Sequence, residues 1–281
     1  MFLRQRRLAR KLSAGRFELA LDQPLVMGVV NITPDSFSDG GRFLGVQEAI
    51  AQARRLAEDG ADLIDIGGES TRPGAAPVSE DEELRRVIPV LEKISDLCVS
   101  VDTRRPRVMQ EALKAGASMI NDVDALTAPG AIDVVAKAGC AVCLMHKKGE
   151  PATMQRDPHY DDVVLEVKRF LNQRVEAARN AGIAPERMVV DPGFGFGKTA
   201  QHNLTLLKHL SELSPLPILV GLSRKSTLGK ITGRPVDERL AGSLAMALLA
   251  LQAGATILRV HDVKETKDVI AVWLSFVEAC K

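Results

Sequence analysis

The sequence predicts a single-domain (β/α)8 barrel, the TIM barrel of the α/β class, from three observations. Short apolar runs alternate eight times with stretches of helical periodicity. The runs lack strict polar alternation, as is typical of strands buried on both faces of a parallel sheet. The connections that follow the runs are long and those that precede them are short, which is typical of a barrel that carries its site on one face.

The eight strand and helix cycles cover the chain from residue 26 onward. The apolar runs lie at 26–30, 63–66, 98–101, 118–120, 141–145, 188–190, 217–220 and 256–260. Apolar residues spaced by three and four predict helices near 46–57, 84–94, 106–114, 130–138, 161–181, 201–211, 238–252 and 265–279. Ser79 and Glu82 form a capping-box pattern at the start of the second helix. A glycine precedes four of the strands, which favours one repeated unit without a domain boundary.

Composition excludes several classes of protein. The chain has 281 residues, 46% hydrophobic and 26% charged, with a formal net charge of +1. These values are typical of a globular enzyme with a large core, and they provide no overall field that would attract nucleic acid or an anionic membrane. No segment predicts a membrane span or a signal peptide, and four cysteines do not predict a disulfide scaffold in a chain of this length. We therefore expect a cytoplasmic protein.

Two local features have an ordinary explanation. Residues 1–16 carry six basic side chains, and we expect a solvated basic extension there, followed by one barrel domain over residues 17–281. Cys140 and Cys143 have the spacing of a redox or zinc motif, but they lie in a predicted strand, where residues three apart point to opposite faces. We therefore expect two buried thiols without a metal.

Acidic and amide residues end three of the apolar runs. Asp102, Asn121 and Asp191 directly follow their strands, and a parallel barrel gathers the carboxyl ends of all its strands on one face. Two carboxylates and a carboxamide can bind the amino-pyrimidinone edge of a flat heterocycle, because a carboxylate accepts two parallel N–H bonds from a guanidine-like group. Each residue alone is equally compatible with a helix cap or a turn.

Cationic side chains at other strand ends predict an anionic substrate. The last two strands of a barrel commonly carry a phosphate site. Asn31 ends the first strand and can ligate Mg²⁺, which takes few protein oxygens when a diphosphate and water supply the others. A turn is the alternative for Asn31, and a solvated surface charge is the alternative for each cation. The cations in question are Arg72, Arg224, Lys225, Arg259 and His261.

Eight motifs then connect these residues to a known family. They are GVVNITPDSFSDGG (28–41), DIGGESTRPGA (65–75), SVDT (100–103), INDV (120–123), CLMH (143–146), DPGFGFGK (191–198), GLSRKS (221–226) and RVHDVKE (259–265). With them the sequence closely resembles the dihydropteroate synthase family over residues 27–267. The resemblance implies a transferase of folate biosynthesis that condenses 6-hydroxymethyl-7,8-dihydropterin diphosphate with 4-aminobenzoate, assisted by Mg²⁺. It also implies a sulfonamide target and a homodimer, for which the apolar stretch 240–254 would provide a surface.

The resemblance implies a role for each matching residue. Catalysis would rest on Asn31, Arg72, Asp102 and Lys225, and pterin binding on Asp102, Asn121, Asp191 and Lys225. The diphosphate would contact Asn31, Arg72, Arg259 and His261, with the metal on Asn31. The aminobenzoate cleft would consist of Thr71, Pro73, Phe196, Lys225 and Ser226. Two alternatives stay open, namely a catalytically silent pterin-binding paralogue and a pterin-binding methyltransferase domain.

Three charged residues depart from the family pattern. Lys147 and Lys148 follow CLMH where relatives often carry uncharged residues, and Asp124 follows INDV at a variable position. We expect them to affect the charge of the barrel mouth and to leave the pocket intact.

Overall fold

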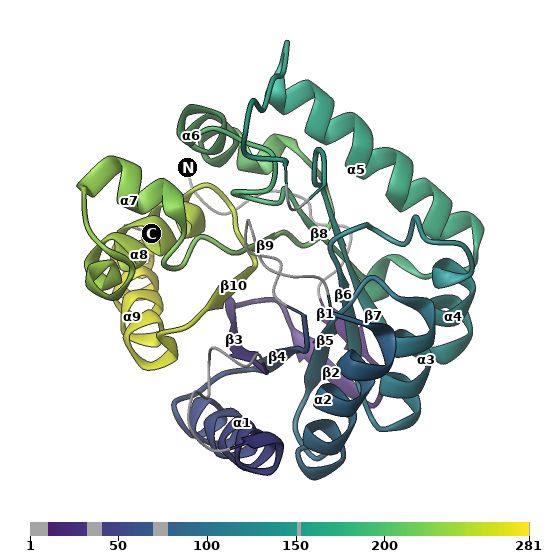
Figure 1. Ribbon diagram of the computed structural model, residues 1–281. Coiled ribbons are helices and arrows are strands. Elements are labelled where there is room, and N and C mark those ends of the chain that lie inside the picture. The colour runs from purple at the N-terminus through teal and green to yellow at the C-terminus, as the bar shows by residue number, and fades with distance from the viewer. Residues whose placement is uncertain (1–10, 33–40, 70–77, 151–152, 281) are drawn as a thin grey trace.

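The computed structural model describes residues 11–32, 41–69, 78–150 and 153–280, without the side chains of residues 41–44, and it contains the predicted barrel (Figure 1). Eight parallel strands are paired in the order β8-β7-β6-β5-β4-β3-β10-β9. A parallel bridge between Val190 and Ile218 joins the two ends of this order and closes the circle. The strands are β3 (Leu25–Asn31), β4 (Leu63–Gly67), β5 (Val99–Asp102), β6 (Met119–Asp122), β7 (Ala141–Met145), β8 (Met188–Asp191), β9 (Leu219–Val220) and β10 (Ile257–Val260).

Helices form the outer layer around these strands (Figure 1). Within the described ranges they are α1 (Gly41–Glu58), α2 (Glu80–Lys93), α3 (Pro106–Lys114), α4 (Ala131–Ala138), α5 (Val163–Asn180), α6 (Ala200–Lys208), α7 (Ser226–Thr232), α8 (Leu240–Gln252) and α9 (Val263–Ala279). The predicted cap of α2 is confirmed, because the Ser79 hydroxyl accepts the backbone N–H of Glu82 at 3.2 Å. In the described part of the chain, no helix is both long and apolar enough to cross a membrane.

Apolar side chains pack into two clusters, one on each side of the strands. The larger cluster fills the space between the strands and the helices, and the smaller one fills the inside of the barrel. Cys140 belongs to the first cluster and Cys143 to the second, and both thiols are buried and form no disulfide. The expectation that the CxxC spacing puts these thiols on opposite faces is confirmed.

An antiparallel hairpin, β1 (Lys11–Ala14) and β2 (Phe17–Ala20), plugs the amino end of the barrel. Leu12 and Ala14 are fully buried against the inner cluster, whereas Lys11 pairs with Glu18 on the exposed side. The expected boundary at residue 16 therefore falls in the turn of this hairpin, because apolar side chains alternate with polar ones and anchor residues 11–16 to the barrel. The single-domain organisation over residues 17–281 stays a prediction, and residues 1–10 lie outside the described part.

The connection between β9 and α8 contains a helix that periodicity did not predict. Helix α7 is only seven residues long, too short to show a repeating apolar face. It begins immediately after Lys225, so it fixes the position of the SRKS segment at the carboxyl end of the barrel.

Candidate active site

Four polar side chains from four strands form one hydrogen-bonded group at the carboxyl end of the barrel. Asp65 of β4 is fully buried, and its Oδ2 accepts from Arg259 Nε of β10 at 2.6 Å and from Asn121 Nδ2 of β6 at 3.1 Å. Asp102 of β5 accepts from Arg259 Nη2 at 3.1 Å. The structure thus brings together Asp102, Asn121 and Arg259, as expected, and adds Asp65 between them.

Burial and opposite charges together control the protonation of this group. Burial raises the pKa of Asp102 to about 7; Arg259 opposes this shift, and the negative charge of Asp65 adds to it. Burial disfavours the Arg259 cation, but Asp65 and Asp102 outweigh it and raise the pKa of the guanidinium. Asp102 therefore changes its charge near neutral pH while Arg259 stays cationic.

Asp191 and Lys225 interact electrostatically with each other and with Arg259. Asp191 Oδ1 accepts the backbone N–H of Gly193 at 2.7 Å, and Lys225 donates to the carbonyl of Phe194. Burial raises the pKa of Asp191, with Lys225 opposing, and burial lowers the pKa of Lys225 to about 8, with Asp191 opposing. The Lys225 ammonium also lies 4.7 Å from the centre of the Phe196 ring, within cation–π range.

A strained turn directs Lys225 toward the barrel axis. Arg224, just before it, has a φ of +55°, a left-handed conformation that is costly for a residue with a side chain. The Ser243 hydroxyl accepts the Arg224 backbone N–H at 3.0 Å, and the Asp262 carboxylate accepts from the Arg224 guanidinium. Arg224 was expected among the cations of the anion site, but here its side chain pairs with Asp262 and holds the turn.

The loop after β8, residues 192–199, packs backbone to backbone on the loop after β7. A Cβ placed on Gly193 would lie 1.8 Å from the His146 carbonyl oxygen, and one on Gly197 would lie 2.1 Å from that of Lys148. Both glycines have positive φ values, +68° and +64°. Only glycine permits this approach and this conformation at once, which explains the Gly-rich motif without a nucleotide.

The side chain of Lys198 stabilises this loop by contacts with its backbone carbonyls. Its ammonium is buried and reaches the carbonyls of Gly193 at 2.9 Å and Phe196 at 3.0 Å, and His146 Nδ1 at 2.9 Å. Burial lowers the pKa of Lys198 well below its usual value, and burial together with the Lys198 charge lowers the pKa of His146 to about 3. His146 is therefore neutral at neutral pH, and its contact with Lys198 holds the segment that carries Phe194 and Phe196.

His261 and Asn31 lie at the ends of the neighbouring strands β10 and β3. His261 Nδ1 is 3.0 Å from the Ser223 hydroxyl, which also accepts the His261 backbone N–H at 3.3 Å. That hydroxyl orients the imidazole at the strand end. Asn31 is half-buried as the last residue of β3 and pairs in register with Gly67.

The remaining predicted site residues are placed only in part. Ser226 is exposed at the first position of α7, one residue after Lys225. Thr71, Arg72 and Pro73 lie outside the described residues, so their expected roles stay predictions.

Sequence reasoning missed two polar side chains near the site, Asp65 and Lys198. Asp65 sits inside the apolar run LIDI, and a carboxylate within an otherwise apolar buried strand was the available signal. Lys198 ends the motif DPGFGFGK without a role assigned to it, and its place at the end of a Gly-rich loop was the available signal for an anchor.

The three departures from the family pattern form ion pairs. Lys147 and Asp124 lie 2.7 Å apart with 14% and 18% of their side chains exposed, and Arg104 approaches Asp124 at 4.0 Å. Lys148 pairs with Glu166 at 3.0 Å. These contacts partly neutralise the added charges, and the three residues themselves lie after β6 and β7 at the carboxyl end of the barrel.

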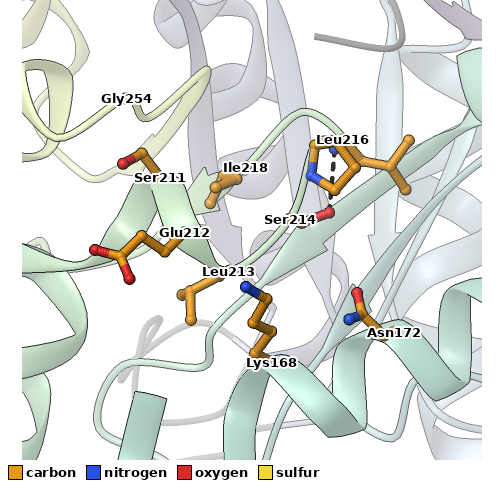
Figure 2. A pocket seen from close by; sticks show the side chains of 10 residues that line it. Lys168, Asn172, Ser211, Glu212, Leu213, Ser214, Leu216, Ile218 and Gly254 are labelled. Atoms are coloured by element: carbon orange, nitrogen blue, oxygen red, sulfur yellow. Dashed lines mark hydrogen bonds between the residues drawn. The ribbon is translucent and has the colours of Figure 1, made fainter. Parts of the chain in front are cut away.

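A separate cavity of about 280 Å³ lies between α5 and the segment that leads into β9 (Figure 2). Lys168 and Asn172 line it from the helix, and Ser214 lines it from the segment before β9, where its hydroxyl accepts the Leu216 backbone N–H at 3.1 Å. This cavity is distant from the strand-end group because it adjoins the amino end of β9.

Fold and site together define an enzyme of the TIM-barrel class, with hydrogen-bond acceptors and cations gathered at the carboxyl ends of its strands. Residues 27–261 match the family described as pterin binding enzyme. The dihydropteroate synthase of Escherichia coli (strain K12) is 50% identical over 267 residues, which cover 93% of this chain and 95% of the relative. The chain therefore belongs to the dihydropteroate synthase family of pterin-binding enzymes, which are transferases.

Solved structures of relatives agree with this membership. The Xanthomonas albilineans dihydropteroate synthase with 4-aminobenzoic acid is 54% identical and superposes with a TM-score of 0.90, covering 95% of this chain and 98% of that one. The same enzyme in complex with 7,8-dihydropteroate gives a TM-score of 0.87 at 51% identity, over 95% and 98% of the two chains. The Yersinia pestis enzyme with a sulfonamide drug gives 0.90 at 48% identity, over 95% and 99%. The predicted fold and family are confirmed.

Proposed function

We propose that this chain joins 6-hydroxymethyl-7,8-dihydropterin diphosphate to 4-aminobenzoate, forming 7,8-dihydropteroate and releasing diphosphate. The observation that carries the proposal is the convergence of Asp65, Asp102, Asn121 and Arg259 in one hydrogen-bonded group at the strand ends. This group occurs in a chain whose whole-length relatives are dihydropteroate synthases.

The pterin would bind where buried acceptors face the pocket. Within the described part of the chain, Asn121 Oδ1 is buried without a hydrogen-bond partner. Buried acceptors of this kind are stabilised by ligand N–H groups, which the amino-pyrimidinone edge of a pterin supplies. Asp102 and Asp191 would accept further N–H groups of the ring, and Lys225 would donate to its carbonyl oxygen.

The diphosphate would bind toward β10 and β3. Arg259 and His261 supply donors there, and Arg72 would join them from the loop after β4. Asn31 is a suitable ligand for a Mg²⁺ ion held mainly by the diphosphate, since the described residues contain no group of three or more acidic, histidine or cysteine side chains that would hold a metal alone. When bound, Mg²⁺ would neutralise charge on the leaving diphosphate.

Aminobenzoate would approach from the side of Phe196 and Ser226, with Lys225 between the two substrates and Thr71 and Pro73 completing the cleft. The bond between the pterin methylene carbon and the diphosphate oxygen breaks, and a bond from that carbon to the arylamine nitrogen forms, with the lost proton leaving to solvent. Positive charge develops on the methylene carbon and the ring, and the Asp102 carboxylate stabilises it. An arylamine is unprotonated at neutral pH, so no strong general base is required.

A homodimer in the cytoplasm also remains a proposal. Four apolar side chains on the adjacent helices α8 and α9 support the dimer, because they are between 36% and 70% exposed: Leu248, Leu249, Val272 and Phe276. Light scattering on the purified protein and on Phe276→Glu tests the dimer. We expect the mass of two chains for the unaltered protein and a lower mass for the variant, and the mass of one chain for both proteins would contradict the dimer.

Product formation tests the proposed function. The purified protein, incubated with the pterin diphosphate, 4-aminobenzoate and Mg²⁺, should form 7,8-dihydropteroate, and a sulfonamide should compete with 4-aminobenzoate. Pterin binding without turnover would support a silent paralogue. Transfer of a methyl group from a methylated pterin would support the methyltransferase alternative.

A further inference from the structure

One carboxylate oxygen links the two halves of the candidate site. Asp65 Oδ2 accepts from Asn121 Nδ2, at the position proposed for the pterin, and from Arg259 Nε, at the position proposed for the diphosphate. Asp65 itself is fully buried under both side chains and is not among the residues that the family resemblance assigns to substrate.

The contact with Asn121 determines which end of its carboxamide faces Asp65. A carboxylate only accepts hydrogen bonds, so the Asn121 NH₂ group must face Asp65 and the carbonyl oxygen must face away from it. That oxygen is buried and lacks a partner among the described residues. Without Asp65 the carboxamide could turn over and present its NH₂ group, which would oppose the N–H groups of a pterin ring.

The contact with Arg259 determines the position of the cation. The guanidinium lies between Asp65 and Asp102, with Nε on the first and Nη2 on the second. A planar guanidinium held through two of its nitrogens cannot rotate without breaking a charged hydrogen bond. Asp65 therefore prevents the Arg259 guanidinium from pairing with the Asp102 carboxylate alone.

We propose that Asp65 is a positioning residue of the condensation, which fixes the acceptor orientation of Asn121 and the placement of Arg259 through a single buried oxygen. This inference rests on the proposed function and adds a residue that would not itself touch substrate. Because Asp65 acts on both neighbours, its loss should change pterin binding and the ionisation of Asp102 together.

The first test compares Asp65→Ala, Asp65→Asn and the control Ser100→Ala. Ser100 is a buried polar residue paired in register with Asp65, without a hydrogen bond to Asn121 or Arg259. Binding of 6-hydroxymethyl-7,8-dihydropterin is measured by calorimetry. We expect Asp65→Ala to weaken binding about tenfold to a hundredfold, Asp65→Asn to restore much of the loss through its amide oxygen, and Ser100→Ala to bind like the unaltered protein.

The second test is the pH profile of kcat/KM for Asp65→Asn. The charged groups that act on Asp102 are Arg259 of β10, Asp65 of β4, Glu83 of α2, Asp122 of β6 and Lys225 before α7. Asp65→Asn removes a negative charge that repels the Asp102 carboxylate, and the Arg259 cation then has Asp102 as its remaining charged hydrogen-bond partner in this group. Both effects lower the pKa of Asp102. The acid limb should move to lower pH in Asp65→Asn and stay in place in Ser100→Ala.

Two results would overturn the inference. They are unchanged pterin affinity in a folded Asp65→Ala protein and an unmoved acid limb in Asp65→Asn. If Asp65→Ala shows no cooperative thermal transition, the pH profile of Asp65→Asn decides alone. Failure of the unaltered protein to bind the pterin contradicts the proposed function itself, whereas binding that is indifferent to Asp65 contradicts only its positioning role.

Discussion

Replacing Gly193 by alanine should disable the site while sparing the fold, and Gly139→Ala provides a matched control. The two glycines have nearly the same φ, +68° and +71°. A Cβ on Gly139 would meet nothing within 4 Å, whereas a Cβ on Gly193 would lie 1.8 Å from the His146 carbonyl oxygen. The left-handed strain is therefore common to both variants, and the clash is specific to Gly193.

The size of the effect follows from these distances. Left-handed strain costs roughly 1–2 kcal/mol in either variant. Since Cβ atoms do not approach other atoms below 3.0 Å, the loop or the His146 carbonyl must move by more than ~1 Å. Such a shift would displace the Gly193 N–H from Asp191 and the Gly193 carbonyl from Lys198. Misplacement by ~1 Å near a reacting group lowers the rate about 100-fold.

Initial rates of 7,8-dihydropteroate formation and thermal unfolding measure the two effects separately. We expect kcat/KM of Gly193→Ala to fall about 100-fold below that of Gly139→Ala, with a further decrease in Tm from the clash. Equal rates in the two variants would refute the reasoning, because the loop could then accommodate a Cβ without moving Asp191 or the Phe194 carbonyl.

Three further predictions follow from the charged groups. Asp102→Asn should lower kcat/KM roughly 100-fold or more in initial-rate assays, and the acid limb of the unaltered enzyme should lie near the Asp102 pKa of about 7. Because that pKa is raised from 3.8, Asp102 stabilises the folded state fully below about pH 4, and this contribution is lost as the pH rises through 7. Asp102→Asn does not titrate, so its Tm relative to that of the unaltered protein should increase from pH 5 to pH 8. A constant difference in Tm would argue against a buried Asp102 charge. Lys225→Met should abolish most turnover without unfolding the protein, and Lys225→Arg should not restore it, since a guanidinium does not fit the position of a point charge at the Phe194 carbonyl. A double-mutant cycle of Lys147→Met and Asp124→Asn, followed by chemical denaturation, should give a coupling near ~1 kcal/mol with little effect on turnover; a large loss of activity would assign the pair to the site.

The barrel could be predicted because its strands lie in apolar runs and its longer helices repeat their apolar spacing. Helices 106–114 and 161–181 were expected within two residues of α3 and α5. The hairpin β1–β2 was not predicted because its segments KLSA and FELA are not continuous apolar runs, and helix α7 was not predicted because seven residues show too few helical repeats. What makes the hairpin stable is the burial of Leu12 and Ala14 inside the barrel, which is a tertiary effect.

The site was predictable where a residue follows its strand and not where it acts through another residue. Asp102, Asn121 and Asp191 could be identified because the end of each apolar run shows which face they share. Asp65 and Lys198 could not, because their importance lies in contacts with Arg259, Asn121 and the carbonyls of the Gly-rich loop, which only the folded chain brings together. Arg224 shows the reverse case, a cation at a strand end that pairs with Asp262.

The stoichiometry of the two products tests the central claim most directly. Diphosphate and 7,8-dihydropteroate are quantified in one reaction of the purified protein, with and without 4-aminobenzoate. We predict that the two products appear in equal amounts, and that both depend on 4-aminobenzoate and are lost in Asp102→Asn. No release of either product, or diphosphate release without dihydropteroate, would contradict a condensation at the strand-end group.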